Sequence, residues 1–138
     1  MKARGTRVYL VEDSPIIRRL LTELIEATGA TIVGYADTAS AAITDISALR
    51  PNVVTVDIRL EAGTGFDVLE ALAISHDEGS APLRIVLTNY ATDAYRDAAQ
   101  QLGADHVFDK AMQIREVLTV LESLSKSNAG GFDSAIAA

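Results

Sequence analysis

The residues in this sequence that could do chemistry are polar side chains that follow short apolar segments. They are Glu12 and Asp13 after residues 8–11, Asp57 near the end of residues 53–58, Thr88 after residues 83–87, and Lys110 near the end of residues 106–108. Three converging carboxylates would repel one another and would be costly to bury without a cation. Mg²⁺ prefers a few carboxylates, a backbone carbonyl and retained water, and an ammonium and a hydroxyl group can bind a phosphoryl oxygen. The set therefore fits phosphoryl transfer to a carboxylate.

Each of these residues also has a structural explanation that involves no chemistry. Glu12 and Asp13 are favourable at a helix N-terminus, where the helix dipole attracts negative charge. A threonine often ends a strand, and a single lysine is most often solvated. Asp57 is harder to explain in this way, because aspartate has a poor strand propensity and here follows an apolar strand. The chemical interpretation depends on the whole set, ordered along successive strand–helix units.

The elements that would position these side chains are alternating strands and helices. Apolar segments at residues 8–11, 53–58 and 83–87 are typical of strands covered on both faces, and residues 31–35 and 106–108 are weaker strand candidates. The first helix is expected to begin at Pro15, with Ser14 as its N-cap, and to stop at Gly29. Further helices are predicted at residues 38–49, 65–74, 92–102 and 112–124. This α/β alternation predicts a doubly wound parallel sheet, with functional loops at the carboxyl ends of its strands.

Composition restricts the class of protein. The chain has 138 residues, of which 49% are hydrophobic, and this suits one domain with a core. Its net charge of −7 argues against direct nucleic-acid binding. With no cysteine, disulfides and thiolate chemistry are excluded, and two histidines are too few for a histidine metal cage. No secretory signal or membrane-spanning apolar stretch is visible, which predicts a cytoplasmic protein without membrane contact.

Four motifs make the sequence resemble the receiver domain of two-component response regulators, of the stand-alone kind that chemotaxis regulators typify. They are VYLVEDS, VVTVDIRLEAGTGFDVL, IVLTNY and GADHVFDK, in this order between about Arg7 and Leu124. The resemblance implies a flavodoxin-like α/β fold with a five-stranded parallel sheet in strand order 2-1-3-4-5. It also implies a receiver domain over residues 1–124. Residues 125–138 are rich in Ser, Gly and Ala and are expected to form a flexible tail.

The resemblance also implies a role for each polar residue. Asp57 matches the phospho-acceptor, which would attack the phosphorus of a phosphohistidine on a partner kinase. The implied ligands of Mg²⁺ are Asp13 directly, Glu12 through water, Asp57, and the backbone carbonyl of Arg59. Thr88 would bind a phosphoryl oxygen and shift on activation, and Lys110 would pair with the phosphoryl group.

Two departures from the family pattern lie around the last strand. Val107 stands where receivers usually carry an aromatic switch residue, and Phe108 comes one place later, on the opposite face of a strand. The sequence therefore does not predict the usual aromatic rotation. Ala111 stands where proline usually follows the lysine. We expect a trans bond there or a strained exception, since a non-proline cis bond costs about 3 kcal/mol.

Further departures lie in the loops after the third and fourth strands. Asn89 follows Thr88 where a small residue is common, which predicts narrower access to the site. Arg59 and Tyr90, each two places after a site residue, are predicted to tune the phosphoryl lifetime in a direction that the sequence leaves open.

The leading hypothesis is a stand-alone receiver that takes a phosphoryl group on Asp57 from a histidine kinase or phosphotransfer protein. It would signal to a downstream protein through altered protein contacts, as a monomer or weak homodimer, with no enzymatic activity beyond its own phosphorylation and dephosphorylation. One alternative is a pseudo-receiver that binds proteins without turning over phosphate, and another is a receiver fragment of a longer regulator. A phosphatase with an aspartate nucleophile is disfavoured, because Arg59 stands where such enzymes place a second aspartate.

Overall fold

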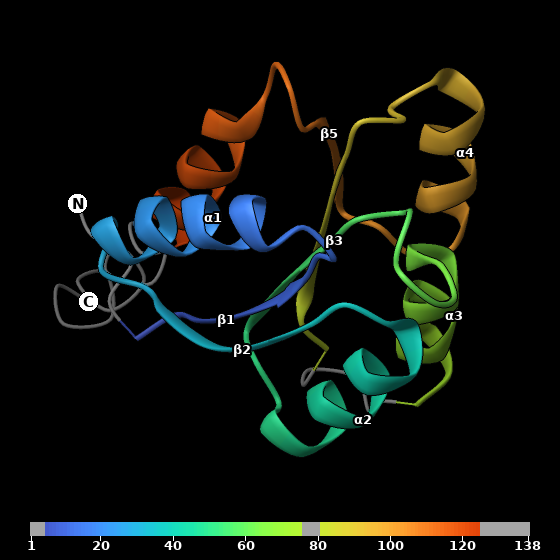
Figure 1. Ribbon diagram of the computed structural model, residues 1–138, viewed down its shortest axis with the longest axis horizontal. Coiled ribbons are helices and arrows are strands. Elements are labelled where there is room, and N and C mark those ends of the chain that lie inside the picture. The colour runs from blue at the N-terminus through green and yellow to red at the C-terminus, as the bar shows by residue number, and fades with distance from the viewer. Residues whose placement is uncertain (1–4, 76–80, 125–138) are drawn as a thin grey trace, which may run out of the picture.

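Strands and helices alternate along the chain, as the apolar periodicity predicts (Figure 1). The computed structural model describes residues 5–75 and 81–124, and the predicted tail at residues 125–138 lies outside them. The elements are β1 (Arg7–Val11), α1 (Pro15–Ala27), β2 (Thr31–Ala36), α2 (Ala39–Leu49), β3 (Val53–Val56), α3 (Gly65–Ser75), β4 (Leu83–Thr88), α4 (Asp93–Gln101) and β5 (His106–Asp109). A last helix occupies residues 114–124.

The five strands form one parallel sheet in the order β2-β1-β3-β4-β5, which confirms the expected topology. β1 pairs with both β2 and β3, so the chain leaves β1 toward one side of the sheet and returns to the other side at β3. In sheets of this type the point where the strand order reverses is where ligands bind, beyond the carboxyl ends of the strands. The ends of β1 and β3 therefore mark the place for a site.

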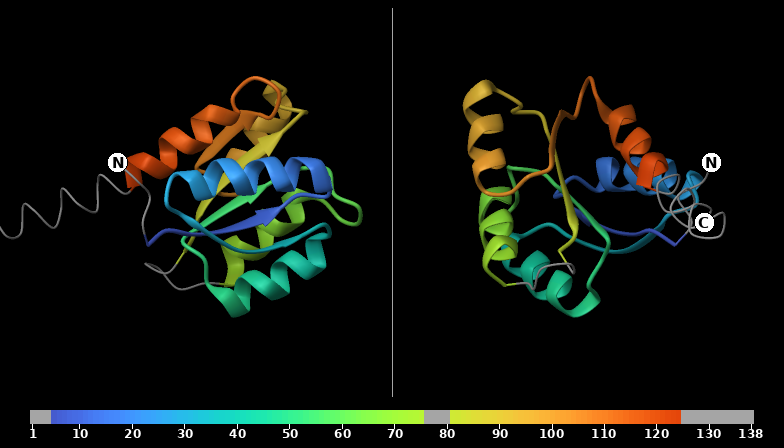
Figure 2. Two further views of the ribbon diagram at one scale, coloured as in Figure 1. Left: turned by 60° about the vertical axis from the view of Figure 1, so that its left-hand side comes forward. Right: turned by 180° about the vertical axis from the view of Figure 1, so that it is seen from behind.

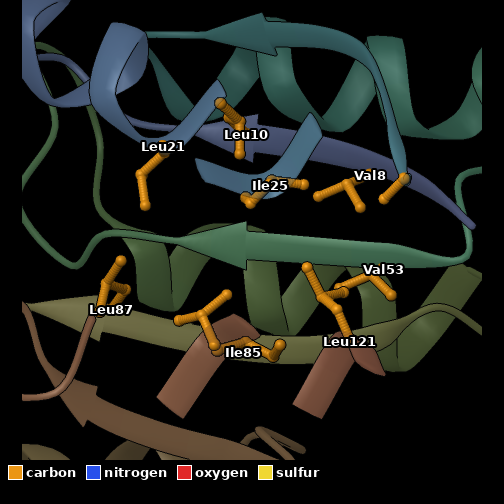
Figure 3. Close-up of a cluster of buried hydrophobic side chains, with 10 residues drawn as sticks. Val8, Leu10, Leu21, Ile25, Val53, Ile85, Leu87 and Leu121 are labelled. Atoms are coloured by element: carbon orange, nitrogen blue, oxygen red, sulfur yellow. The ribbon is translucent and has the colours of Figure 1, made fainter. Parts of the chain in front are cut away.

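Alternate residues of the strands face opposite helical layers. Val8 and Leu10 of β1 belong to a core cluster with Leu21 of α1 and Leu121 of the last helix (Figure 3). Tyr9 and Val11 of β1, with Val54 and Val56 of β3, belong instead to a cluster with residues of α2 and α3. Two views of the ribbon show α1 with the last helix on one face of the sheet and α2 with α3 on the other (Figure 2). Burial on both faces explains why the central strands β1, β3 and β4 are largely apolar.

The helix ends follow the capping residues in the sequence. Ser14 caps α1 by accepting a hydrogen bond from the amide of Ile17, as predicted, and Pro15 is the first helical residue. Thr38 and Thr92 are N-caps, so α2 and α4 begin one residue later than predicted. The last helix begins at residue 114, not 112, because the side chain of Asp109 accepts the amides of residues 111 and 112 and holds a turn there.

Tyr9 joins the sheet to α2 through a polar contact inside an apolar layer. Its side chain is fully buried, and its hydroxyl donates a hydrogen bond of 2.6 Å to Asp45 of α2. Burial, followed by this hydrogen bond and the negative charge of Asp45, raises the pKa of Tyr9 well above its ordinary value. Tyr9 therefore stays neutral at any ordinary pH.

None of the helices in the described part of the chain combines the length and apolar character that crossing a bilayer requires.

Candidate functional site

Asp57 lies at the carboxyl end of β3, just past the last strand residue. The strand ends at Val56, two residues earlier than the predicted segment 53–58, yet the amide of Asp57 still donates to the carbonyl of Val11 at 2.9 Å. On the other side, Gly65 packs against Asp57 so closely that a Cβ on Gly65 would lie 2.3 Å from the Asp57 carbonyl oxygen. The backbone of Asp57 is thus held between β1 and the first residue of α3.

Glu12 and Asp13 follow β1, beside Asp57. Glu12 is almost fully buried; its amide donates to the carbonyl of Ala36, and its Oε2 accepts the amide of Ser14 at 3.0 Å. Asp13 is exposed. One carboxylate oxygen from each of Glu12, Asp13 and Asp57 lies within 4.8 Å of the other two. The structure therefore brings together the three acidic residues that the sequence analysis selected.

Lys110 links two of these carboxylates. Its Nζ lies 2.6 Å from Asp57 Oδ2 and 2.7 Å from Glu12 Oε1, and all three side chains are buried. The backbone of Lys110 is placed by β4, because its amide donates to the carbonyl of Thr88 at 2.9 Å. Lys110, which the sequence analysis selected as the cation of the site, is thus part of a buried charge cluster with Asp57 and Glu12.

The electrostatics of this cluster are dominated by burial and pairing. Burial raises the pKa of Glu12, and this outweighs the opposing effect of its hydrogen bonds with Lys110 and Ser14. Burial would lower the pKa of Lys110, but its hydrogen bonds to Asp57 and Glu12 raise it overall, so the lysine remains an ammonium ion. Three carboxylates against one ammonium leave two negative charges in excess when all are ionised. A divalent cation would balance that excess.

The donor atoms fit a hard cation such as Mg²⁺. Within the described residues, Asp57 Oδ1 is buried and has no hydrogen-bond partner, which is costly for a charged oxygen unless something else binds it. Mg²⁺ is usually bound by a few carboxylate oxygens together with retained water, and of the three carboxylates here that of Asp13 is exposed to solvent. Arg59, whose carbonyl is the remaining predicted ligand, lies two residues beyond Asp57 and forms a backbone bridge with Thr64.

Thr88 and the neighbouring loop residues form the next part of the site. Thr88 is fully buried, and its Oγ1 accepts the amide of Tyr90 at 3.1 Å, which leaves its own proton free to donate. The guanidinium carbon of Arg59 lies 4.0 Å from the centre of the Tyr90 ring, a cation–π distance. The two predicted tuning residues therefore contact each other and join the loops after β3 and β4. The side chain of Asn89 is exposed.

Val107, which stands where receivers usually carry an aromatic residue, and the following Phe108 lie on opposite faces of β5, as predicted. Val107 is buried in a cluster with Ile58, Val86 and Ala99 on the α4 side. Phe108 packs against the α1 side of the sheet and stacks on His106, with ring centres 5.4 Å apart. No cis peptide bond occurs in the described residues, so the bond after Lys110 is trans.

Two residues near the site were not selected by sequence reasoning. Gly65 allows α3 to approach Asp57, and a glycine at the first residue of a helix is the signal that could have identified it. Arg96 reaches from α4 to β5; it lies one residue after a half-buried tyrosine and three before the buried Ala99, on the side of α4 nearest the sheet. An arginine on this side of a helix is only weak sequence evidence for a role near the site, and its hydrogen bonds in the structure are what identify it.

Comparisons with known proteins agree with this geometry. The profile of the response regulator receiver domain matches residues 8–122. A protein-glutamate methylesterase/protein-glutamine glutaminase of Hahella chejuensis is 35% identical over 97 residues, which cover 70% of this chain and 27% of that protein. Two further curated relatives of the same description are covered to 32% and 28%, so the chain spans about a third or less of the curated relatives it matches.

Solved structures show the same fold. A DNA-binding response regulator of the LuxR family from Staphylococcus aureus superposes with a TM-score of 0.77 at 25% identity, covering 87% of this chain and 98% of that one. The response regulator domain of Thermotoga maritima CheB gives a TM-score of 0.74 at 23% identity, with 90% and 96% covered. With the profile matching nearly all of the described residues, the chain belongs to the response regulator receiver domain family.

Proposed function

We propose that this receiver takes up a phosphoryl group on Asp57 from the phosphohistidine of a histidine kinase or phosphotransfer protein. The observation that carries the proposal is the pairing of the buried Asp57 with Lys110, beside Glu12 and Asp13. One oxygen of Asp57 is held by the lysine, and the other is buried without a protein partner among the described residues. An aspartate in this setting has both a nucleophilic oxygen and the positive charge that an incoming phosphoryl group needs.

The reaction would be a direct displacement at phosphorus. A carboxylate oxygen of Asp57 forms a bond to phosphorus as the bond to the histidine nitrogen breaks, and the imidazole leaves with that electron pair. The Lys110 ammonium and the Thr88 hydroxyl would bind phosphoryl oxygens as the charge moves. Asp13, Asp57, Glu12 and the Arg59 carbonyl would hold Mg²⁺, whose charge offsets the repulsion between carboxylates and phosphoryl oxygens.

The proposal is tested by phosphorylation of the purified chain with acetyl phosphate and Mg²⁺. Intact-mass spectrometry should show one added phosphoryl group, and none after Asp57→Asn or when EDTA replaces Mg²⁺. Asp97→Asn is a matched control, since it removes an exposed aspartate of α4. The proposal fails if Asp57→Asn gains as much phosphate as the unchanged chain, and a chain that neither binds Mg²⁺ nor gains phosphate would be a pseudo-receiver.

The consequence of phosphorylation is proposed to be a change in protein contacts. A phosphoryl group adds roughly −1.5 to −2 charge to a pocket already rich in carboxylates, which biases the loops after β3 and β4 toward a second arrangement. The output would be a separate cytoplasmic protein or an effector domain, and the methylesterase description of the curated relatives favours testing an enzyme as the effector. Sedimentation with and without acetyl phosphate tests whether the chain stays a monomer or forms a weak homodimer.

A further inference from the structure

Arg96 of α4 uses all three of its guanidinium nitrogens as hydrogen-bond donors to three different segments. Its Nε donates to the carbonyl of Ala91 at 3.1 Å, in the loop between β4 and α4. Its Nη1 donates to the carbonyl of Val107 in β5 at 2.6 Å, and its Nη2 donates to Gln113 Oε1 at 3.3 Å, just before the last helix. α4 lies beside β5 in the structure, which makes these contacts possible (Figure 1).

The segments that Arg96 joins are the two that carry Thr88 and Lys110. Ala91 is three residues after Thr88, and its neighbour Tyr90 donates its amide to Thr88 Oγ1. Val107 is three residues before Lys110. The loop after Thr88 and the chain around Lys110 therefore meet at one side chain that belongs to neither.

Gln113 extends this contact toward the phosphoryl site and the last helix. Its Oε1 accepts both the Arg96 guanidinium and, at 2.9 Å, the amide of Asp109, which directly precedes Lys110. The amide of Gln113 in turn donates to the Asp109 carbonyl at 2.7 Å. A displacement of Arg96 would thus also displace residues 107–113 and the start of the helix over residues 114–124.

The acceptors require an arginine. Two are backbone carbonyls and one is a side-chain amide, so the contact depends on directed donors and not on opposite charge. A planar guanidinium presents donors in fixed directions, whereas a lysine has one nitrogen and could not reach three separated acceptors. The side chain is also half-buried, which limits competition from water.

We propose that Arg96 is a positioning residue that ties the loop after Thr88 to the chain around Lys110, so that displacement of the first segment is passed to the second. The proposal rests on the proposed function, because the displacement in question is the one that follows phosphorylation of Asp57. Signal transfer then passes through the Arg96 guanidinium and Gln113 to the start of the last helix. The side chain at position 107 is a buried valine and takes part only through its backbone carbonyl.

The test follows amide resonances of the isotope-labelled full chain by NMR when Mg²⁺ and beryllium fluoride, an analogue of the phosphoryl group, are added. In the unchanged chain, resonances of residues 89–91 and of residues 107, 109 and 113 should shift together. In Arg96→Met and Arg96→Lys, the loop resonances should still shift, while the shifts at residues 107 and 113 should become much smaller. Asp109 adjoins Lys110, which contacts the phosphoryl analogue in every variant, so its resonance should shift in all of them. Arg115→Met, which removes an exposed arginine of the neighbouring helix, should behave like the unchanged chain.

The proposal is overturned if Arg96→Met keeps the full shifts at residues 107 and 113. A second comparison needs no phosphoryl analogue. Tyr90→Ala should shift the resonances of Asp109 and Gln113 when Arg96 is present, and should not shift them in a chain that also carries Arg96→Met. Equal shifts in the two chains would also overturn the proposal. If the unchanged chain does not respond to beryllium fluoride, the proposed function fails, and this second comparison still decides the role of Arg96. Should Arg96→Met not fold, Gln113→Ala replaces it, and an unaltered response of Asp109 to Tyr90→Ala in that variant contradicts the proposal.

Discussion

Lys110→Met is expected to destabilise the metal-free protein strongly and to make its stability depend on Mg²⁺. The ammonium group lies 2.6 Å from Asp57 and 2.7 Å from Glu12, and each of the three side chains is at most 8% exposed. Methionine has a similar length and no charge, so the substitution removes the cation while largely filling its space. Two buried carboxylates then face each other without a counter-ion.

The magnitude follows from the burial of the pair. Removing one partner of a buried ion pair costs about 3–5 kcal/mol, because the remaining charge is left uncompensated. We expect the lower end, about 3 kcal/mol, because burial already raises the pKa of Glu12 and the glutamate can relieve part of the repulsion by taking up a proton. With a slope of about 1.5 kcal/mol per M, this lowers the urea midpoint by roughly 2 M.

Urea unfolding followed by far-ultraviolet circular dichroism measures the effect, since the chain has no tryptophan for fluorescence. In EDTA the variant should unfold at a much lower urea concentration than the unchanged chain. Adding Mg²⁺ should narrow the difference, because the excess negative charge of the variant binds the cation more tightly. Above the dissociation constant, each tenfold increase in Mg²⁺ concentration adds about 1.4 kcal/mol to the stability of the folded state.

Two controls distinguish the effect of leaving buried carboxylates without a counter-ion from the effect of removing any positively charged side chain. Arg19→Met removes an exposed arginine whose pair with Glu23 is on the surface of α1, and it should change stability by less than about 0.5 kcal/mol. Asp57→Asn should restore much of the stability lost in Lys110→Met, because it removes one of the two facing charges. Equal urea midpoints for Lys110→Met and the unchanged chain in EDTA would refute the reasoning.

Three further predictions concern the surroundings of the site. Gly65→Ala should cost about 3 kcal/mol in urea unfolding, because the added Cβ would lie 2.3 Å from the backbone carbonyl of Asp57, and an unchanged midpoint would show that α3 can move aside. Arg59→Ala and Tyr90→Ala should each speed loss of the phosphoryl group in a mass-spectrometric time course, and the double variant should be no faster than either, because each single change already breaks their contact. The raised pKa of Tyr9 means that the unfolded chain releases this proton first, so stability should fall by up to about 1.4 kcal/mol per unit as pH rises above about 10. Tyr9→Phe should lose that part of the slope, and identical slopes would contradict the assignment.

Much of the fold could be predicted from sequence because its signals are local. The apolar segments around Val8, Val53 and Leu83 are buried on both faces, and helix starts such as Ser14–Pro15 follow capping rules that involve only neighbouring residues. Boundaries differed by one or two residues where a side chain competes for backbone amides, as at Asp109. The order of polar residues after successive strands also lay in the sequence, since parallel strands bring their carboxyl ends to one edge.

What only the tertiary structure decided is which of those polar groups touch. Lys110 is 53 residues from Asp57 in sequence, and its short contacts with Asp57 and Glu12 depend on how β5, β3 and β1 are aligned in the sheet. The stacking of Arg59 on Tyr90 and the three bonds of Arg96 likewise join separate loops. Periodicity and capping report on neighbours along the chain, whereas these contacts depend on side-chain directions and distances that exist only after the sheet and its helices have packed.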